Sequence, residues 1–391
     1  MSPGRRGARP LDEPGDGPSR PRTPPRWVIY VDLDAYYVAC EIRDRPDLAG
    51  KPVIVGPPPS AGPTRGVVLS ASYEARPFGV HSALPVQIAA RLCPQATWVP
   101  PDFEKYERVS REVRALLRTF SSEVVPFSID EAVVGTDAPG PEEARSIAER
   151  IQRALAGTLG LPSSLGVATT RLVAKMATDA AKPGRIVVVP PEGVARFVAP
   201  LPVRAVPGVG PKTEQRLRSE GILTIGDLAS RTPGEVARWL GSFGRELVAL
   251  ARGEPVESPL EETGPRSRST DRTFAEDVTS WPELESAVRE LAQDLARTLD
   301  REGLRYGAVG IGLRWSDFSR SQRVRSLSGA AEGPASMAER AVHLARELWE
   351  AEGKGQGRPV RTVSVRAERL SGRRLHQVSL DEFGGRAGAR R

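Results

Sequence analysis

Three acidic residues that lie far apart in the sequence carry the clearest chemical signal. Asp32 follows the apolar run 27–31, whereas Asp130 and Glu131 are neighbours between two short β-like segments. Carboxylates that meet at one edge of a sheet repel one another unless a cation neutralises them. Ligands that are all oxygen select Mg²⁺ or Mn²⁺, and two such ions about 3.5–4 Å apart can hold the entering and leaving oxygens of a phosphoryl transfer. Each acid could instead be a cap, a turn residue or a salt-bridge partner.

Basic and aromatic side chains in two other segments suit phosphate binding. Arg76 lies three residues after Tyr73, and an arginine fork with a tyrosine hydroxyl can bind a phosphate group. Lys175 and Lys182 are seven residues apart, about two helical turns, so they lie on similar faces of a helix. Lysine is rare in this chain, with six among 56 basic residues, which favours phosphate contacts for this pair. Ordinary surface positions are the alternative.

The segment 207–212 (PGVGPK) has the pattern of a tight turn that opens a helix. Gly208 and Gly210 would expose backbone N–H groups, and Lys212 adds positive charge near the helix N-terminus, so a DNA phosphate could bind there. The pattern is typical of a helix–hairpin–helix element, which binds the DNA backbone without reading its sequence. An ordinary turn between two helices is the alternative.

The order of the expected elements explains how the three acids would meet. Between residues 27 and 168 a strand and an inserted block are followed by helix, strand, strand, helix and strand. This is the split βαβ order of a ferredoxin-like domain, in which the first strand lies beside the third in the middle of the sheet. Asp32 and the acidic pair therefore reach the same edge. The expected elements are a strand from 27, helix 104–120, strands 124–129 and 132–135, helix 142–155 and strand 164–168.

A second βαββαβ pattern follows a short helical region and a polar linker. Alternate residues of the expected strand 308–315 are apolar, which leaves a small, basic-edged opposite face that could lie close to a backbone. Arg323 and Arg325 project from one face of the next strand and are candidate DNA contacts, with a solvated edge strand as the alternative. The expected elements are strand 266–274, helix 284–299, strands 308–315 and 323–327, helix 337–349 and strand 360–367.

Composition and charge limit the class of protein. At 391 residues the chain should form two to four domains, and 39% hydrophobic with 27% charged residues suits a soluble globular protein. No apolar run approaches the roughly 20 residues of a membrane span, and no signal-peptide core is found near the start. Cys40 and Cys93 are too few for a disulfide framework or a zinc site, so we expect a reducing cytoplasm. The arms 1–26 and 372–391 carry +3 each of the net +7, so bulk charge is weak evidence for nucleic-acid binding.

Several longer motifs occur in an order that is typical of one protein family. They are VDLDAYYVACEIRDRPDLAGKPVIVG, SASYEARPFGVHSALP, FSIDEA, LGVATTRLVAKMATDAAKPGR and PGVGPKTEQRL. The chain resembles the Y-family translesion DNA polymerases, and most closely the DinB type. This resemblance implies an α+β fold with a ferredoxin-like palm, small fingers, a helical thumb with helix–hairpin–helix, and a βαββαβ little finger. The implied domains are a disordered arm (1–26), palm (27–35 and 102–190), fingers (36–101), thumb (191–255), linker (256–265), little finger (266–371) and flexible tail (372–391).

The resemblance also implies roles for single residues. Asp32 and Asp130 would bind two Mg²⁺ ions, or Mn²⁺, together with the backbone carbonyl of Leu33. Glu131 would be the third catalytic carboxylate and a further metal ligand. Tyr37 takes the steric-gate position, where an aromatic ring excludes a ribose 2′-hydroxyl. The implied nucleotide contacts are Tyr36, Ser70, Tyr73, Arg76 and Lys182.

One residue and one segment in these motifs are not implied to bind metal. Asp34 lies inside the first motif but is not a usual metal ligand of the family. After Glu131 the family often continues with an aromatic residue or leucine and an aspartate, whereas residues 132–135 are AVVG here. This departure changes the packing of the strand but removes no ligand.

The tail segment 376–383 (HQVSLDEF) resembles the short clamp-binding peptide of bacterial polymerases. Gln377, Leu380 and Phe383 would be its contacts, with the two apolar side chains entering an apolar pocket as an extended peptide. Two acids separate Leu380 from Phe383, which departs from the usual form. A clamp-binding tail and a tail without that function are both open.

These features predict an active template-directed DNA polymerase of low fidelity, without a proofreading exonuclease. Primer–template DNA, dNTP and a sliding clamp are the expected partners of a cytoplasmic monomer that binds no membrane. A catalytically inactive, polymerase-like accessory subunit of a mutagenesis complex is the alternative, although such relatives typically lack one or more acidic ligands. A two-metal nuclease or nucleotidyl cyclase would share the palm chemistry but explains neither the hairpin motif nor the second βαββαβ domain.

Overall fold

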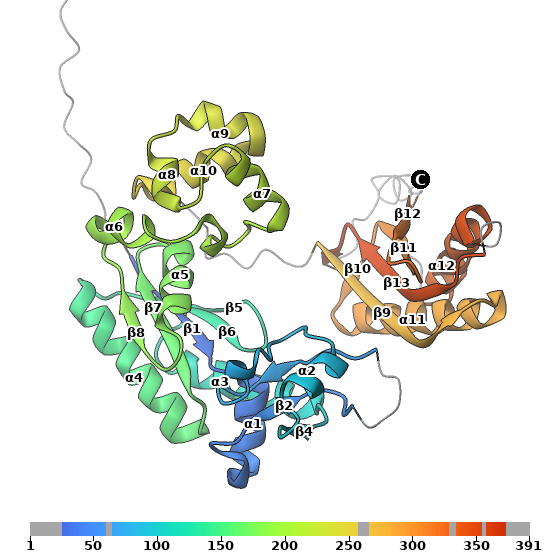
Figure 1. Ribbon diagram of the computed structural model, residues 1–391, viewed down its shortest axis with the longest axis horizontal. Helices are drawn as coiled ribbons and strands as arrows, with labels where there is room; N and C mark the ends of the chain where they lie inside the picture. Colours follow the sequence, from blue (N-terminus) through green and yellow to red (C-terminus); the bar gives the residue numbers. More distant parts are fainter. Residues whose placement is uncertain (1–25, 60–64, 257–265, 328–333, 354–356, 373–391) are drawn as a thin grey trace, which may run out of the picture. The chain divides into compact units, whose positions relative to one another are not determined.

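The computed structural model describes five stretches of the chain (Figure 1). Their contacts divide the chain into two units. The first unit combines residues 1–49 with 102–261, and the second combines 50–101 with 262–391. Residues 1–25 of the predicted arm, most of the linker and residues 373–391 of the tail, with Gln377, Leu380 and Phe383, lie outside the described residues. The described stretches are 26–59, 65–256, 266–327, 334–353 and 357–372.

A five-stranded sheet forms the centre of the first unit. Its strand order is β5-β6-β1-β7-β8, and β1 is antiparallel to both of its neighbours. The predicted ferredoxin-like arrangement, with the first strand beside the third in the middle, is therefore confirmed. An additional edge strand, β8, runs parallel to β7. The strands are β1 (Trp27–Leu33), β5 (Val124–Pro126), β6 (Glu131–Thr136), β7 (Ser163–Ala168) and β8 (Ile186–Val188).

Two long amphipathic helices of this unit confirm the helical periodicity of the sequence. α3 (Phe103–Arg118) begins where the Asp102 side chain accepts a hydrogen bond from the N–H of Lys105. α4 (Pro141–Leu159) begins with proline at its first turn and ends at Gly160, which has the left-handed backbone that favours glycine. α4 thus continues past residue 155, the end that apolar spacing predicts, as far as the glycine that terminates it.

Helix α5 (Arg171–Ala181) lies unusually close to the sheet. A Cβ atom on Gly166 of β7 would be 2.0 Å from the carbonyl oxygen of Ala174 and 2.4 Å from the backbone nitrogen of Thr178. Only glycine allows this approach, because any side chain would overlap with the helix backbone. The Thr178 hydroxyl also donates to the carbonyl oxygen of Tyr30 on β1. α5 is therefore held in a fixed position over β1 and β7.

Residues 194–251 are mostly helical, as the sequence predicts. Two of the helices start with capping boxes, in which Thr224 and Thr232 exchange hydrogen bonds with the residue three positions further on. One apolar cluster joins these helices with α5 and the sheet, so the two parts share a core. The helices are α6 (Val194–Val198), α7 (Pro211–Ser219), α8 (Ile225–Ala229), α9 (Pro233–Leu240) and α10 (Ser242–Ala251).

The first part of the second unit, residues 50–101, encloses a small core. Strand β2 is antiparallel to β3 and parallel to β4. Helix α1 (Tyr36–Asp44), which the sequence assigns to this part, belongs to the first unit, where it packs against α3. The expected boundary of the fingers at residue 36 stays a prediction. The elements of this part are β2 (Val53–Val55), β3 (Ser70–Ala71), α2 (Val86–Leu92) and β4 (Thr97–Val99).

The second part of this unit has the predicted βαββαβ order. Its sheet has the order β12-β11-β13-β9, so the second and fourth strands of the pattern are central here, unlike in the first unit. Alternate residues of β11 pack with two helices in one apolar core, which confirms the expected apolar face of that strand. The elements are β9 (Ser267–Val278), α11 (Trp281–Arg301), β10 (Leu304–Arg305), β11 (Ala308–Trp315), β12 (Arg320–Ser326), α12 (Pro334–Leu348), β13 (Val360–Glu368) and β14 (Ser371–Gly372).

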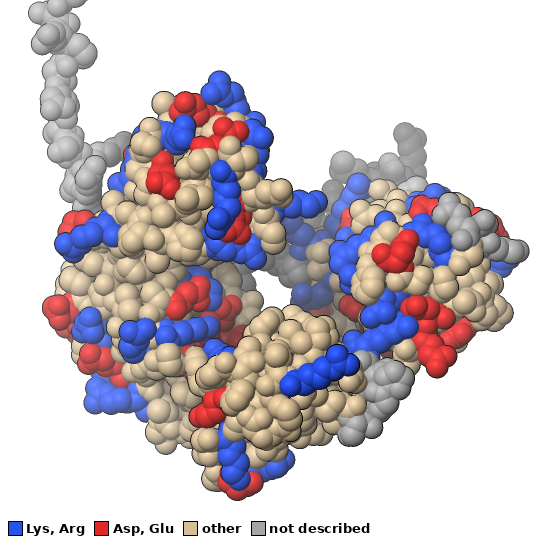
Figure 2. Space-filling view, in the orientation of Figure 1, with Lys and Arg blue, Asp and Glu red and all other residues tan. Residues whose placement is uncertain are grey.

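Charged side chains of both signs are interspersed over the face of the molecule shown in Figure 2. This distribution agrees with the near balance of charge that the sequence shows outside its two arms. Within the described stretches, no helix is long and apolar enough to cross a membrane.

Candidate active site

Strands β1 and β6 bring two of the three predicted acids together. Asp32 and Glu131 are directly opposite each other in the antiparallel pair, so their side chains lie on the same face. The N–H of Leu33 donates to the carbonyl oxygen of Asp130 over 3.0 Å, which holds the hairpin to the end of β1. Asp32 is only 3% exposed and Glu131 is half-buried. Acids that are far apart in the chain thus reach one edge of the sheet.

Asp130 lies in the same hairpin, but its carboxylate has a different partner. The hydroxyl of Ser128 donates to Asp130 Oδ1, and the N–H of Asp130 donates to Ser128 Oγ over 3.2 Å. Among the residues that the structure describes, no three His, Cys, Asp or Glu side chains are grouped closely enough to hold a metal ion. The structure therefore shows Asp32 and Glu131 as a close pair, with the Asp130 carboxylate bound to a serine.

Two lysines from α5 and its C-terminal end neutralise this acidic pair. Lys175 Nζ is 3.2 Å from Asp32 Oδ2 and 2.5 Å from Glu131 Oε1, and it also contacts Asp179 at 3.1 Å. Lys182 Nζ is 2.7 Å from the same Asp32 oxygen. The two lysines that the sequence singles out therefore contact the predicted carboxylates, and their ammonium groups offset the negative charge of the pair.

Burial sets the electrostatics of the cluster. Burial raises the pKa of Asp32 to about 6, although the hydrogen bond and charge of Lys182 and the charge of Lys175 oppose the change. Burial also raises the pKa of Glu131, but the hydrogen bond from Lys175 outweighs it and holds that pKa below its usual value. For Lys175 itself, burial lowers the pKa, whereas its contacts with Glu131 and Asp32 raise it further, so the ammonium stays charged.

The donor set of this cluster suits a hard divalent cation. The candidate ligands are all oxygen atoms, which is the chemistry that Mg²⁺ and Mn²⁺ prefer. The nearly inaccessible Asp32 carboxylate requires a positive partner, because a buried charge without one is strongly unfavourable. A divalent ion would supply from one centre the charge that the two lysines supply from two.

Tyr37, the predicted steric gate, stands in a cluster of aromatic rings at the start of α1. Its ring centroid is 4.7 Å from that of Tyr106 and 6.5 Å from that of Phe103, both on α3. Tyr36 beside it is 2% exposed and donates its hydroxyl to the carbonyl oxygen of Tyr106 over 2.6 Å. The side chain of Tyr36 thus serves the core, which leaves only its backbone for the predicted nucleotide contact.

A buried acid on α1, Glu41, holds the ring of Tyr106, which packs against Tyr37. Glu41 is 3% exposed and accepts hydrogen bonds from the Tyr106 hydroxyl at 2.7 Å and from Lys105 Nζ at 2.8 Å. The sequence places Tyr106 among the apolar positions of a helix, but apolar spacing does not show that its hydroxyl reaches Glu41. Sequence reasoning therefore missed the group that positions the neighbour of Tyr37.

Three of the predicted nucleotide contacts belong to the second unit. Ser70 is buried on β3, and Tyr73 follows in the loop after that strand. The guanidinium of Arg76 lies 4.1 Å above the centre of the Tyr73 ring, and its Nε donates to the carbonyl oxygen of Ala71. The structure therefore brings the half-buried Tyr73 and the exposed Arg76 into one cation–π pair.

The predicted turn before α7 is present in the first unit. Gly208 has a φ of +97°, a conformation that favours glycine, and Gly210 takes the position just before the helix. A side chain on Gly208 would also come within 3.3 Å of the ring of Phe243. Lys212 is exposed in the first turn of the helix. Both the glycines and the basic residue therefore stand where a backbone phosphate could approach.

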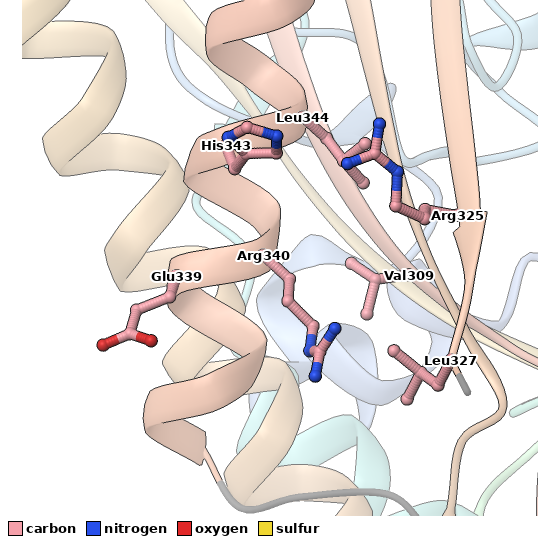
Figure 3. A pocket seen from close by; sticks show the side chains of 7 residues that line it. All are labelled: Val309, Arg325, Leu327, Glu339, Arg340, His343 and Leu344. Atoms are coloured by element: carbon pink, nitrogen blue, oxygen red, sulfur yellow. The ribbon is translucent and has the colours of Figure 1, made fainter. Parts of the chain in front are cut away.

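Arg323 and Arg325 lie on the side of their sheet that faces α12. Arg323 Nη1 donates to Glu347 Oε2 over 2.7 Å, and Arg325 Nη2 donates to Glu347 Oε1 over 3.0 Å. Figure 3 shows Arg325 with His343 in a pocket between β12 and α12, with a volume of about 270 Å³. The two predicted DNA contacts are thus paired with an acid on a helix, and their role with DNA stays a prediction.

The opposite, open face of this sheet carries the small residues that the sequence predicts for it. Gly310 and Gly312 of β11 lie opposite Arg366 and Ser364 of β13. Together they line a shallow depression on this face. The small, basic-edged face is therefore real, but it does not include Arg323 and Arg325.

A second cavity in the first unit adjoins the acidic pair. It has a volume of about 330 Å³, and its lining includes Tyr30, Phe127, Arg171 and Lys175. The rings of Tyr30 and Phe127 are stacked at 6.0 Å, and the guanidinium of Arg171 lies 4.6 Å from the ring centre of Phe127. The sequence gives no local signal for this group, because its members come from separate elements.

Comparison with known proteins identifies the family. The impB/mucB/samB family matches residues 31–179, its C-terminal domain matches 265–380, and the HHH motif of the IMS family matches 191–222. The DNA polymerase IV of Methanoculleus marisnigri is 40% identical over 359 residues, which cover 92% of this chain and 98% of that protein. The DNA polymerase IV of Stenotrophomonas maltophilia is 44% identical over 272 residues, 68% of this chain and 72% of that protein.

Solved structures show the same fold. A chimera of the Y-family DNA polymerases Dbh and Dpo4 has a TM-score of 0.78 at 24% identity, covering 88% of this chain and 99% of that one. DinB from Sulfolobus solfataricus has a TM-score of 0.60 at 24% identity, with the same coverage of both chains. The fold, with palm, fingers, thumb and little finger, and the motifs together define a Y-family polymerase. The chain belongs to the impB/mucB/samB family and, within it, to the DinB type.

Proposed function

We propose that the chain is a template-directed DNA polymerase of the translesion type, which transfers a nucleotide from a dNTP to the 3′-hydroxyl of a primer. The observation that carries the proposal is the buried Asp32–Glu131 pair at the edge of a ferredoxin-like sheet, neutralised by two lysines. With divalent cations bound to its acids, such a site would stabilise the negative charge that develops on a phosphate during transfer. Relatives that are about 40% identical over most of this chain are named DNA polymerase IV, which supports the same reaction here.

In this proposal, Asp32, Asp130 and Glu131 would hold two Mg²⁺ ions together with the carbonyl oxygen of Leu33. When bound, the ions neutralise phosphate charge and favour the ionised primer hydroxyl. Glu131 and Asp32 already share one face of the sheet, whereas the Asp130 carboxylate would have to leave Ser128 and turn toward them. The lysines contact the acids through their terminal ammonium groups, so they can turn toward a triphosphate while their helix stays in place.

The nucleotide contacts divide between recognition of the sugar and binding of the phosphates. Tyr37 excludes a 2′-hydroxyl, because Tyr106 and Phe103 limit the positions that its ring can take. Lys182 provides a compact positive charge for the triphosphate. The remaining proposed contacts are the backbone of Tyr36, together with Ser70, Tyr73 and Arg76.

Primer–template DNA is the proposed second substrate. Gly208, Gly210 and Lys212 would bind its backbone at the start of α7, independent of sequence. Arg323 and Arg325 would contribute only after release from Glu347. We further propose a monomeric, cytoplasmic enzyme that binds a sliding clamp through its tail.

Nothing in the comparisons favours the catalytically inactive accessory subunit. Relatives of that kind would lack acidic ligands, whereas Asp32, Asp130 and Glu131 are all present. The close Asp32–Glu131 pair is also intact in the structure. The active polymerase is therefore the better-supported function.

Primer extension tests the proposal directly. Asp130→Ala and Glu131→Ala should each lower the extension rate by about a thousandfold, because charge stabilisation in the transition state is lost. Binding of primer–template DNA, followed by fluorescence anisotropy, should change little. Glu149→Ala, an exposed acid on α4, is the matched control and should retain full activity. Retained extension by both active-site variants would remove the assignment.

A further inference from the structure

Asp34 is a buried acid that is neither a proposed metal ligand nor part of the apolar core. It follows β1 directly and is only 2% exposed. Its backbone N–H donates to the carbonyl oxygen of Pro162 over 2.9 Å, so the residue is fixed in the sheet edge. Because burial of a carboxylate is unfavourable unless hydrogen bonds compensate it, the partners of this side chain indicate what it does.

Those partners lie on β7 and in the loop after α5. The hydroxyl of Ser164 is 2.9 Å from both carboxylate oxygens of Asp34, and the N–H of Gly184 donates to Asp34 Oδ2 over 2.9 Å. The same N–H also lies 2.9 Å from Ser164 Oγ, which closes a three-membered hydrogen-bond network. Ser164 is fully buried, so water does not compete for these bonds.

This network anchors the loop that carries Lys182. Gly184 is two residues after Lys182, and the residue between them is Pro183, whose ring fixes its φ angle. Lys182 itself directly follows Ala181, the last residue of α5, and caps the end of that helix. One end of the loop is therefore held by the helix. The other end is held by Asp34 and Ser164 at the Gly184 N–H and by Gln152, whose Nε2 donates to the Gly184 carbonyl oxygen over 3.1 Å.

The anchored lysine reaches the acidic pair from this loop. Lys182 Nζ is 2.7 Å from Asp32 Oδ2, and its side chain is one third exposed. Release of the Gly184 N–H would loosen this end of the loop, which Gln152 then holds through the Gly184 carbonyl oxygen. The ammonium group would then lose its fixed distance to Asp32, although the helix that precedes it would stay in place.

We propose that Asp34 is a positioning residue, which holds the loop 182–184 so that Lys182 points at the triphosphate-binding side of the active site. The proposal rests on the proposed polymerase function for the identity of the substrate. It assigns Asp34 no contact with metal or nucleotide. Its effect passes entirely through Lys182, and this dependence makes it testable.

Steady-state primer extension with a double-mutant cycle is the first test. Asp34→Asn keeps the shape of the side chain but weakens the bond to Gly184, and it should raise the KM for dNTP about tenfold. The kcat and the affinity for primer–template DNA should change much less. In a Lys182→Ala background, Asp34→Asn should have no further effect on KM, because the group it positions is gone. Additive effects of the two substitutions would overturn the proposal.

A second buried acid provides the matched control. Glu41 is as buried as Asp34, but its partners are Tyr106 and Lys105. Whatever Glu41→Gln does to KM should be the same with and without Lys182. Coupling of Glu41 to Lys182 as strong as that of Asp34 would mean that general loss of packing explains the result, and it would also overturn the proposal.

Two further measurements keep the outcome clear if Asp34→Asn folds poorly or if the enzyme is inactive. Ser164→Ala removes one member of the network and should raise the KM for dNTP in the same Lys182-dependent way. Acylation of Lys182 by an amine-reactive reagent, followed by mass spectrometry without metal or substrate, should be faster in both variants. An unchanged acylation rate would refute the positioning role, whereas a wild-type chain that extends no primer would refute only the proposed function.

Discussion

Replacement of Lys175 by methionine tests whether the acidic pair is a cation site. The substitution removes the ammonium group but keeps most of the volume of the side chain. Lys175 Nζ contacts Asp32 and Glu131, and the side chain is 21% exposed, while that of Asp32 is 4% exposed. Lys175→Met therefore leaves two partly or fully buried carboxylates with one positive neighbour, Lys182.

The structure sets the size of the expected effect. Removal of one partner from a buried ion pair costs about 3–5 kcal/mol of folding free energy. Lys182 still neutralises Asp32 and Glu131 is partly solvated, so we expect about 2–3 kcal/mol in metal-free buffer. A divalent ion that binds the acids would restore the missing charge. The loss in excess Mg²⁺ should therefore be below about 1 kcal/mol, since a ligand that binds only the folded state stabilises it.

Urea unfolding, followed by circular dichroism with EDTA and with Mg²⁺ at matched ionic strength, measures this difference. Lys105→Met is the control, because Lys105 also contacts a buried acid, Glu41, but lies on α3, away from the acidic pair. Its loss of stability should be the same in both buffers. If Mg²⁺ restores the free energy of unfolding of Lys175→Met no better than that of Lys105→Met, the acids do not form the cation site and the reasoning fails.

Three other predictions follow from single contacts. Tyr37→Ala should raise the ratio of kcat/KM for ribonucleotides over deoxynucleotides at least about tenfold, and an unchanged ratio would contradict the gate role. Gly166→Ala should cost about 3 kcal/mol in urea unfolding because its Cβ would overlap with α5, whereas Gly157→Ala, with open space around it, should not destabilise. Equal effects would show that α5 can move. Lys212→Ala should lower the salt dependence of DNA affinity by about one unit of log–log slope, with exposed Lys51→Ala as the control, and an unaltered slope would exclude the phosphate contact.

The first sheet could be predicted from sequence because its local patterns agree with one another. The apolar strands, the helical spacing of α3 and α4 and the element order all require the ferredoxin-like arrangement. That arrangement alone places Asp32 opposite Glu131. The partner of the Asp130 carboxylate could not be predicted, because it depends on one rotamer in a four-residue turn.

The orientation of β12 could not be predicted from its residues. Val324 is the one apolar residue of this strand, yet it is 48% exposed on the open face of the sheet. The face toward α12 carries Ser321, Arg323 and Arg325, and the ion pairs of the two arginines with Glu347 replace apolar packing there. Alternation of residue types shows which residues share a face, but the helix decides which face is covered.

The burial of two acids could not be predicted from the sequence either. Asp34 and Glu41 resemble solvent-exposed residues in any hydropathy pattern, and only partners from distant segments explain their burial. The two acids flank Tyr37 in the sequence: Asp34 lies just after β1, and Glu41 lies on α1. The segment that carries the proposed gate is thus held at both ends by carboxylates whose role is visible only in the folded chain.

The ion pairs of the buried carboxylates Asp32 and Glu41 share one feature, which is that their cation is lysine. Arginine is the usual cation of this chain, since only six of its 56 basic residues are lysine. Three of those six, Lys105, Lys175 and Lys182, contact buried carboxylates of the first unit. A guanidinium brings five donors in a rigid plane, whereas an ammonium is a compact charge on a flexible stem that can exchange partners. Lysine is therefore used where a positive charge must fit into the palm, and at Asp32 it can give way to an ion or move to a phosphate.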